Sequence, residues 1–169
     1  MPLSASRPSL SFRAVNRAVE PGYNPGLQRH HLLPLQVLSV RPLGKVIERL
    51  GLERLGMHDF RRNGLLLPAR EDAARRIGLP LHRGPHRSYN EPVLERSGQI
   101  EAGWSRARLR GSDGADLEAL MRFDLLQRAL RRRLLDPARW SRMPLNRRDP
   151  ALDFSHLDAM AEMLWAATG

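Results

Sequence analysis

Residues 27–38 read LQRHHLLPLQVL and set two adjacent histidines, His30 and His31, in an apolar frame. In an extended strand, successive side chains point to opposite faces of the sheet. One imidazole can therefore hold a cation while its neighbour takes a proton from water. Pro34 lacks a backbone N–H, so the strand that carries the pair is expected to be short or to lie at an edge.

Three polar residues further along the chain complete a set that suits one metal site and one general base. They are Asn63, His82 and His86. Asn63-Gly64 is a turn signal, and it leads into residues 65–68 (LLLP), which predict a short buried strand closed by proline. Residues 82–86 (HRGPH) are typical of a helix entry, with glycine as the cap and proline in the first turn.

Helical patterns surround these motifs. The spacing of apolar residues predicts a helix over 43–55, with weak points at its glycines, and a brief helix over 70–77. Pro92 leaves open whether one bent helix or two pieces span 85–97.

The clearest helix is expected from about Asp116 to Leu135, and a final helix from about 155 to 167. The apolar residues expected on one side of the first of these helices are Leu117, Leu120, Met121, Leu125, Leu126, Ala129 and Leu130.

The composition excludes several classes of protein. The chain has 169 residues, of which 41% are apolar and 27% charged, enough for one domain with a substantial core. It has no cysteine, which excludes disulfides, thiolate zinc sites and cysteine nucleophiles. No apolar run is long enough to cross a bilayer, and the first twenty residues lack a secretory signal. We therefore expect no membrane partner and a cytoplasmic location.

The charge is strongly positive and unevenly distributed. The net charge is +10, and 27 of the 28 basic residues are arginines. Residues 27–99 hold 13 basic and 7 acidic residues, 101–148 hold 12 and 6, and 149–169 hold four acids and no base. Such a surface suits the neutralisation of phosphates, and arginine suits bidentate phosphate contacts better than lysine does. Charge alone leaves ribosomal, membrane-surface and acidic-protein partners open.

The order of the motifs carries more information than any one of them. A strand with two histidines is followed by an inserted helix, an Asn-led strand and a helix entry with two more histidines. This order resembles the HNH/endonuclease VII superfamily with its ββα-metal core, and most closely the AHH nuclease family found among bacterial toxin modules. The matching stretches are His30-His31, residues 63–68 (NGLLLP) and residues 81–90 (LHRGPHRSYN), and Arg29 stands where the family name expects alanine.

The resemblance implies an α+β, mostly helical fold with a small ββα-metal core, a two-stranded hairpin plus a helix. On this basis we divide the chain into a loop-rich lead-in over 1–26, a nuclease core over 27–100 and an Arg-rich helical extension over 101–169.

The resemblance also implies a role for each histidine and for the asparagine. His30, His82 and His86 would hold one divalent metal ion, and His31 would act as general base on the attacking water. Imidazole suits that task because its unperturbed pKa is about 6.5. Asn63 would fix the loop and hold the base through a backbone carbonyl or its own amide. A His-rich ligand set favours zinc, nickel, cobalt or manganese over magnesium, and the identity of the ion stays open.

Other side chains are assigned around this centre. Tyr89 is expected in the core or beside the ligands, and Asn90 as a ligand or as a helix cap before Pro92. The candidates for phosphate binding are Arg83, Arg87, Arg131, Arg132 and Arg133. The last three have a second interpretation, because cations near a helix C-terminus are favoured by the backbone dipole.

These observations predict a metal-dependent endonuclease that hydrolyses DNA, with RNA as the alternative substrate. Aromatic residues make up only 5% of the chain, too few for a base-stacking platform, so little sequence specificity is expected. One alternative is a non-catalytic Arg-rich nucleic-acid-binding protein whose histidines hold a structural ion. Another is a toxin module held by an immunity protein, in which case the chain would be a secreted effector.

Overall fold

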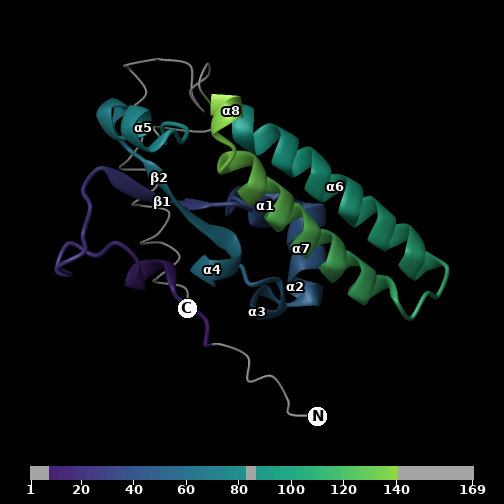
Figure 1. Ribbon diagram of the computed structural model, residues 1–169. Helices are drawn as coiled ribbons and strands as arrows, with labels where there is room; N and C mark the ends of the chain where they lie inside the picture. Colours follow the sequence, from purple (N-terminus) through teal and green to yellow (C-terminus); the bar gives the residue numbers. More distant parts are fainter. Residues whose placement is uncertain (1–7, 83–86, 141–169) are drawn as a thin grey trace, which may run out of the picture.

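Two short antiparallel strands and a set of helices form the protein (Figure 1). The computed structural model describes residues 8–82 and 87–140. β1 (Leu27–His31) pairs with β2 (Gly64–Pro68), and the register sets His31 opposite Gly64. The helices are η1 (Phe12–Ala14), α1 (Gln36–Ser39), α2 (Arg41–Leu50), α3 (Leu52–Leu55), α4 (Phe60–Asn63), α5 (Glu71–Ile77), α6 (Arg87–Leu109), α7 (Ala115–Leu134) and α8 (Pro137–Trp140). The predicted α+β, mostly helical fold is confirmed.

The two strands are joined by a long helical insertion, residues 32–63, which carries α1 to α4. The helix predicted over 43–55 is divided at Gly51, whose φ of 90° is open to glycine and costly for other residues. Gly78, with φ of 72°, ends α5 in the left-handed conformation common at helix C-termini.

Asn63-Gly64 does not form a turn, so the turn predicted there is wrong. Asn63 is the last residue of α4, and Gly64 opens β2 in an extended conformation with φ of −113°. The glycine is required for packing, because a Cβ at this position would overlap the ring of Phe60. Asn63-Gly64 therefore marks the end of a helix followed by a close contact with the ring of Phe60. Asparagine and glycine are also the residue types typical of a turn.

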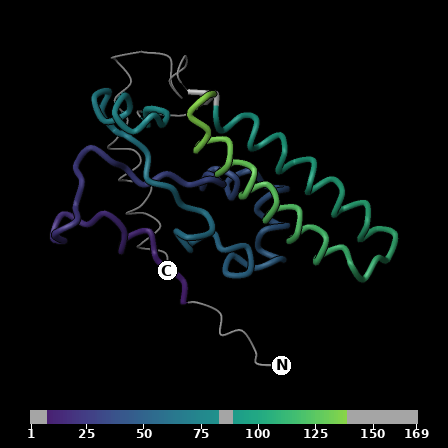
Figure 2. Tube along the Cα trace, viewed as in Figure 1, coloured from purple at the N-terminus to yellow at the C-terminus, as the bar shows by residue number. Residues whose placement is uncertain are grey.

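α6 and α7 form a helical hairpin that lies along one side of the molecule (Figures 1 and 2). α6 is one helix that continues through Pro92, which settles the question left open by the sequence. Near the connection between α6 and α7, the indole Nε1 of Trp104 donates to Asp116 at 2.7 Å. Arg49 of α2 and Arg108 of α6 pair with the same carboxylate at 3.3 and 3.6 Å. This hydrogen bond and these cations hold the pKa of Asp116 below its usual value.

The hairpin packs on α2 and α3 and shares one hydrophobic core with the strands. The residues of α6 and α7 in that core are Tyr89, Val93, Ile100, Ala119, Phe123 and Leu134. Residue 100, the predicted boundary between nuclease core and extension, falls inside α6. The functional division of the chain stays a prediction.

The apolar side predicted for α7 is wrong in part. Leu117, Met121 and Leu125 are 59–61% exposed, whereas Phe123 is fully buried. Leu120, Leu126 and Leu130 do pack against the core. Apolar residues lie on both sides of this helix, so periodicity alone could not show which side faces inward.

No helix in the described part of the chain is long and apolar enough to span a bilayer. The helix predicted over 155–167 and the helix entry at 83–86 lie outside the described residues.

The orientation of α7 can be tested by two truncations on the same helix. Phe123→Ala should lower the free energy of unfolding by about 3–5 kcal/mol, because it empties a fully buried position. Leu125→Ala, at a position 61% exposed, should change it by less than about 0.5 kcal/mol. Urea unfolding followed by circular dichroism measures both, and comparable losses would contradict this orientation.

Candidate active site

The end of β1 gives its two histidines different surroundings. His30 is 3% exposed, and its ring meets the rings of His82 and Tyr89 edge to face, at centroid distances of 5.0 and 4.7 Å. His31 instead stacks on Phe12, with centroids 3.8 Å apart and planes within 7°. The alternation predicted from the sequence therefore separates the two imidazoles into different environments.

His82 is fixed by two contacts with the sheet. Its backbone N–H donates to the carbonyl of Pro68 at 2.6 Å, which ties the segment after α5 to the end of β2. Its Nδ1 lies 3.0 Å from the amide oxygen of Gln28 on β1. An amide oxygen only accepts, so Nδ1 carries the proton and Nε2 carries the lone pair, the tautomer seen when a second residue orients a metal-binding histidine.

The pair formed by His30 and His82 has the donor chemistry of part of a metal site. Two imidazoles from different elements meet in a buried place, and both are ligands that zinc, nickel and manganese accept. Within residues 8–82 and 87–140, no group of three or more histidine, aspartate or glutamate side chains is close enough to hold an ion. His86, the predicted third ligand, lies outside the described residues.

The surroundings of His31 favour the neutral form of its imidazole. Burial is the main cause that lowers its pKa to about 4, and the charges of His58 and Arg29 lower it further. A neutral imidazole can accept a proton at physiological pH, as the general base of the sequence-based prediction must. The sequence indicated no function for His58. Its side chain is exposed, and its charge contributes to the lowered pKa of His31.

Phe12 is the residue that the sequence reasoning missed. It is 9% exposed and lies between His31, on which it stacks, and Phe60, whose ring it meets edge to face at 5.1 Å. Nη1 of Arg29 donates to its carbonyl oxygen at 2.9 Å and holds this segment against β1. The only signal in the sequence was that Phe12 is one of two aromatic residues in the lead-in over 1–26, which is weak.

Asn63 is fully buried and holds the segment that follows His31. Its Oδ1 accepts from the backbone N–H of Leu33 at 2.8 Å, and its Nδ2 donates to the carbonyls of Leu33 and Met57 at 3.2 and 3.1 Å. The backbone carbonyl of Asn63 accepts from the N–H of Leu32 at 2.8 Å. These contacts show that Asn63 positions the backbone that follows His31.

The two polar residues at the start of α6 have structural partners. The hydroxyl of Tyr89 donates to the carbonyl of Leu32 at 2.7 Å, and burial raises its pKa above the usual range. Asn90 donates from Nδ2 to the amide oxygen of Gln36 at 3.1 Å. Tyr89 therefore lies beside His30, as predicted, whereas the role of Asn90 as a ligand stays a prediction.

The basic end of α7 lies beside the histidines. Nη2 of Arg131 donates to the carbonyls of Arg61 and Gly64 at 2.8 and 2.7 Å, and Gly64 is the register partner of His31. The charge of Arg133 is close enough to act on the hydroxyl of Tyr89. Arg132 is exposed, Arg83 lies outside the described residues, and Arg87 begins α6.

Comparison with known families gives the class of the protein. Residues 11–128 match the model of AHH, a nuclease family of the HNH/ENDO VII superfamily with conserved AHH. The match covers more than half of the chain, and the chain belongs to this family. The protein is therefore a metal-dependent nuclease, and its substrate is nucleic acid. Comparison with curated proteins and with solved structures gives no match.

The positioning role of Asn63 can be measured as stability. Asn63→Ala leaves the backbone groups of Leu33 and the carbonyl of Met57 buried without this partner, and should cost about 3 kcal/mol or more. Asn90→Ala removes a side-chain hydrogen bond at an exposed site and should cost less than about 1 kcal/mol. Equal urea midpoints for the two variants would show that Asn63 does not hold this segment.

Proposed function

We propose that the chain is an endonuclease that hydrolyses phosphodiester bonds of DNA with little sequence specificity. In this proposal His31 is the general base, and His30 and His82, together with His86, hold one divalent ion. A bound ion supplies stabilisation of the negative charge that develops on the phosphate and on the leaving oxygen.

The observation that carries this proposal is that the two neighbouring imidazoles, those of His30 and His31, lie in different environments. His31 stacks on Phe12 and has a pKa lowered to about 4, so its ring is neutral across the physiological range. His30 faces His82, whose Nδ1 is occupied by Gln28. A purely structural histidine pair would not require one ring to be a base and the other to meet a second histidine.

The chain's own residues then prepare the reaction. The ring of Phe12, stacked on His31, restricts rotation of that imidazole, so its ring nitrogen is held ready to accept the proton of a water molecule. Asn63 fixes the backbone just after this base, and the hydroxyl of Tyr89 fixes the carbonyl of Leu32. Such preorganisation lowers the cost of reaching the transition state.

Charge and composition favour a nucleic acid that is bound through its phosphate backbone. Arg133 lies near Tyr89, so a cation stands beside the histidines, where a phosphate would be bound. Few aromatic residues are present to stack on bases, so contacts with phosphates would supply most of the binding, and these carry no sequence information. Both properties would also serve RNA, which is the alternative substrate.

Two histidine variants separate the proton acceptor from the ligand. His31→Ala should lower plasmid nicking by about 10²- to 10⁴-fold, the usual contribution of a general base, with metal binding retained. His30→Ala should weaken metal binding as well as nicking. Nicking of supercoiled plasmid in Zn²⁺, Ni²⁺, Mn²⁺ or Mg²⁺, with and without EDTA, and calorimetric titration of the metal measure these effects.

Leu125→Ala, at an exposed position of α7, is the matched control and should nick like the parent. If His31→Ala nicks as fast as the parent, the general base is wrongly assigned. If the parent binds DNA but cuts it with none of these metals, the chain is a binding protein whose histidines are structural.

A further inference from the structure

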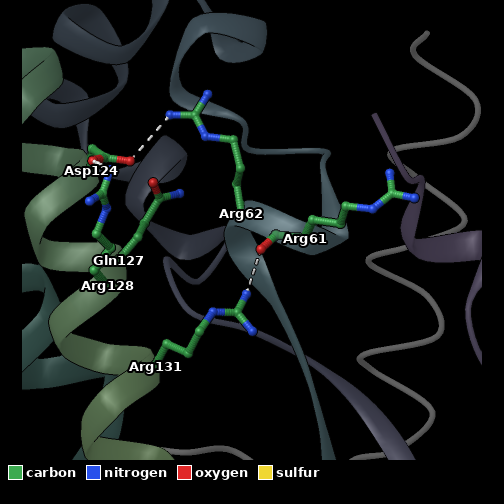
Figure 3. Close-up of a pocket in the computed structure, with 6 residues that line it drawn as sticks. All are labelled: Arg61, Arg62, Asp124, Gln127, Arg128 and Arg131. Atoms are coloured by element: carbon green, nitrogen blue, oxygen red, sulfur yellow. Dashed lines mark hydrogen bonds and ion pairs between the residues drawn. The ribbon is translucent and has the colours of Figure 1, made fainter. Parts of the chain in front are cut away.

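A basic pocket lies between α4 and α7, and none of the histidines lines it. It has a volume of about 340 Å³, at the small end of the range for ligand sites, and its lining residues are Arg61, Arg62, Asp124, Gln127, Arg128 and Arg131 (Figure 3). Asp124 is the one carboxylate among these six residues, so the lining carries a clear positive excess.

The guanidinium groups are held largely by backbone carbonyls, which orient a cation without cancelling its charge. Arg62 donates to the carbonyl of Arg54 at 2.8 Å, and Arg131 donates to those of Arg61 and Gly64. A Cβ at Gly56 would come within 2.7 Å of Cδ of Arg62, so the glycine gives that side chain room to lie across the backbone.

Asp124 neutralises part of this charge and is shared. It pairs with Arg128 at 2.7 Å and with Arg62 at 3.7 Å. Figure 3 shows the guanidinium of Arg62 extended toward Asp124 from one side and that of Arg128 from the other. One carboxylate between two guanidiniums leaves donors and net positive charge for an added anion, because each guanidinium has five N–H groups.

Gln127 connects the pocket to the histidine end of the sheet. Its side chain is 2% exposed, and its Nε2 donates to the carbonyl of Leu55 at 3.2 Å and to Oδ1 of Asn63 at 3.3 Å. Its Oε1 is buried and has no hydrogen-bond partner among residues 8–82 and 87–140. The pocket therefore holds an unsatisfied acceptor next to the residue that positions the backbone after His31.

We propose that this pocket binds a phosphodiester of the substrate strand, at a nucleotide away from the bond that is cut. The inference rests on the proposed function, because it takes the ligand to be the nucleic acid on which the chain acts. The guanidiniums of Arg62 and Arg128 contact the phosphate oxygens. A nucleotide also brings base N–H donors beside its phosphate, and these suit the acceptor on Gln127.

The geometry links binding in the pocket to the position of the general base. Arg131 donates to the carbonyl of Gly64, which pairs with His31 across the sheet, and Gln127 contacts Asn63. Through Arg131 and Gln127, a strand bound in the pocket is therefore connected to Gly64 and Asn63. These two residues position the backbone around His31. The bound strand would reach the histidines in a fixed register.

The test compares two ion pairs of the same type on the same helix. Arg128 pairs with Asp124, and Arg122 pairs with Glu118, both four residues apart on α7, but only Arg128 lines the pocket. Affinity of the full chain for a fluorescein-labelled DNA duplex is measured by anisotropy in EDTA over a range of NaCl concentrations. Working in EDTA makes the readout independent of cleavage.

Arg128→Gln should weaken binding several-fold and reduce the slope of log affinity against log salt by about 0.9, the value for one lost phosphate contact. Arg122→Gln should leave both quantities close to those of the parent. Asp124→Asn should act in the opposite direction and strengthen binding, because it removes the competing carboxylate. A loss of structure could not produce that gain.

Equal effects of Arg128→Gln and Arg122→Gln, or weaker binding by Asp124→Asn, would overturn the proposal. Competition by inorganic phosphate as effective as that by unlabelled DNA, per phosphate, would show a general anion site and would also overturn it. The outcome is separable from that of the proposed function. A chain that nicks DNA but is indifferent to Arg128 loses only the pocket, and one that shows the pocket effects without nicking loses only the catalytic proposal.

Discussion

The buried amide of Asn63 is the interaction on which the site depends. The chain leaves β1 at His31 and returns to β2 at Gly64 only after the whole helical insertion. At that junction the side chain of Asn63 bonds both backbone groups of Leu33, and its carbonyl accepts from Leu32. Asn63, the last residue of the insertion, is thus hydrogen-bonded to Leu32 and Leu33, the first two. Because a buried unsatisfied backbone group costs about 1–3 kcal/mol, few other side chains could stand there.

Closing the junction fixes more than the backbone. A two-stranded sheet is only marginally stable by itself, and its last residue pair would fray. Holding Leu32 and Leu33 in place keeps His31 paired with Gly64, and strand alternation then sends the two imidazoles to different faces. The buried stack on Phe12 disfavours the charged form of His31, while the polar contact with Gln28 selects a tautomer of His82. The local environment thus favours a neutral ring at His31 and one defined tautomer at His82.

The sequence predicted the elements that have a periodic or compositional signal. The strand around the histidine pair, the strand after Gly64, the helix over 70–77 and the long helix from residue 116 are all present. It could not predict contacts between distant segments. Phe12 reaches His31 only in the folded chain, and Arg62 reaches the pocket only because Gly56 leaves room beside its side chain.

The errors have physical causes of the same kind. Asn63-Gly64 was read as a turn because a helix end beside a close-packed ring uses the same two residue types. The prediction for the inward side of α7 is wrong because leucines lie on both sides of the helix, and what decides between them is its packing against α6 and α3. Both decisions are made by tertiary packing, which local pattern does not contain.

The distribution of charge follows from this packing. Guanidiniums bonded to carboxylates gain attraction but lose the net charge that a polyanion would feel, whereas those bonded to carbonyls keep it. Arg29 and Arg131 each donate to a carbonyl oxygen close to the sheet, and Arg62 donates to a carbonyl oxygen of the insertion while also pairing with Asp124. Gln127, bonded to Asn63, couples this basic face to the junction that orients the histidines, so the two cannot shift independently.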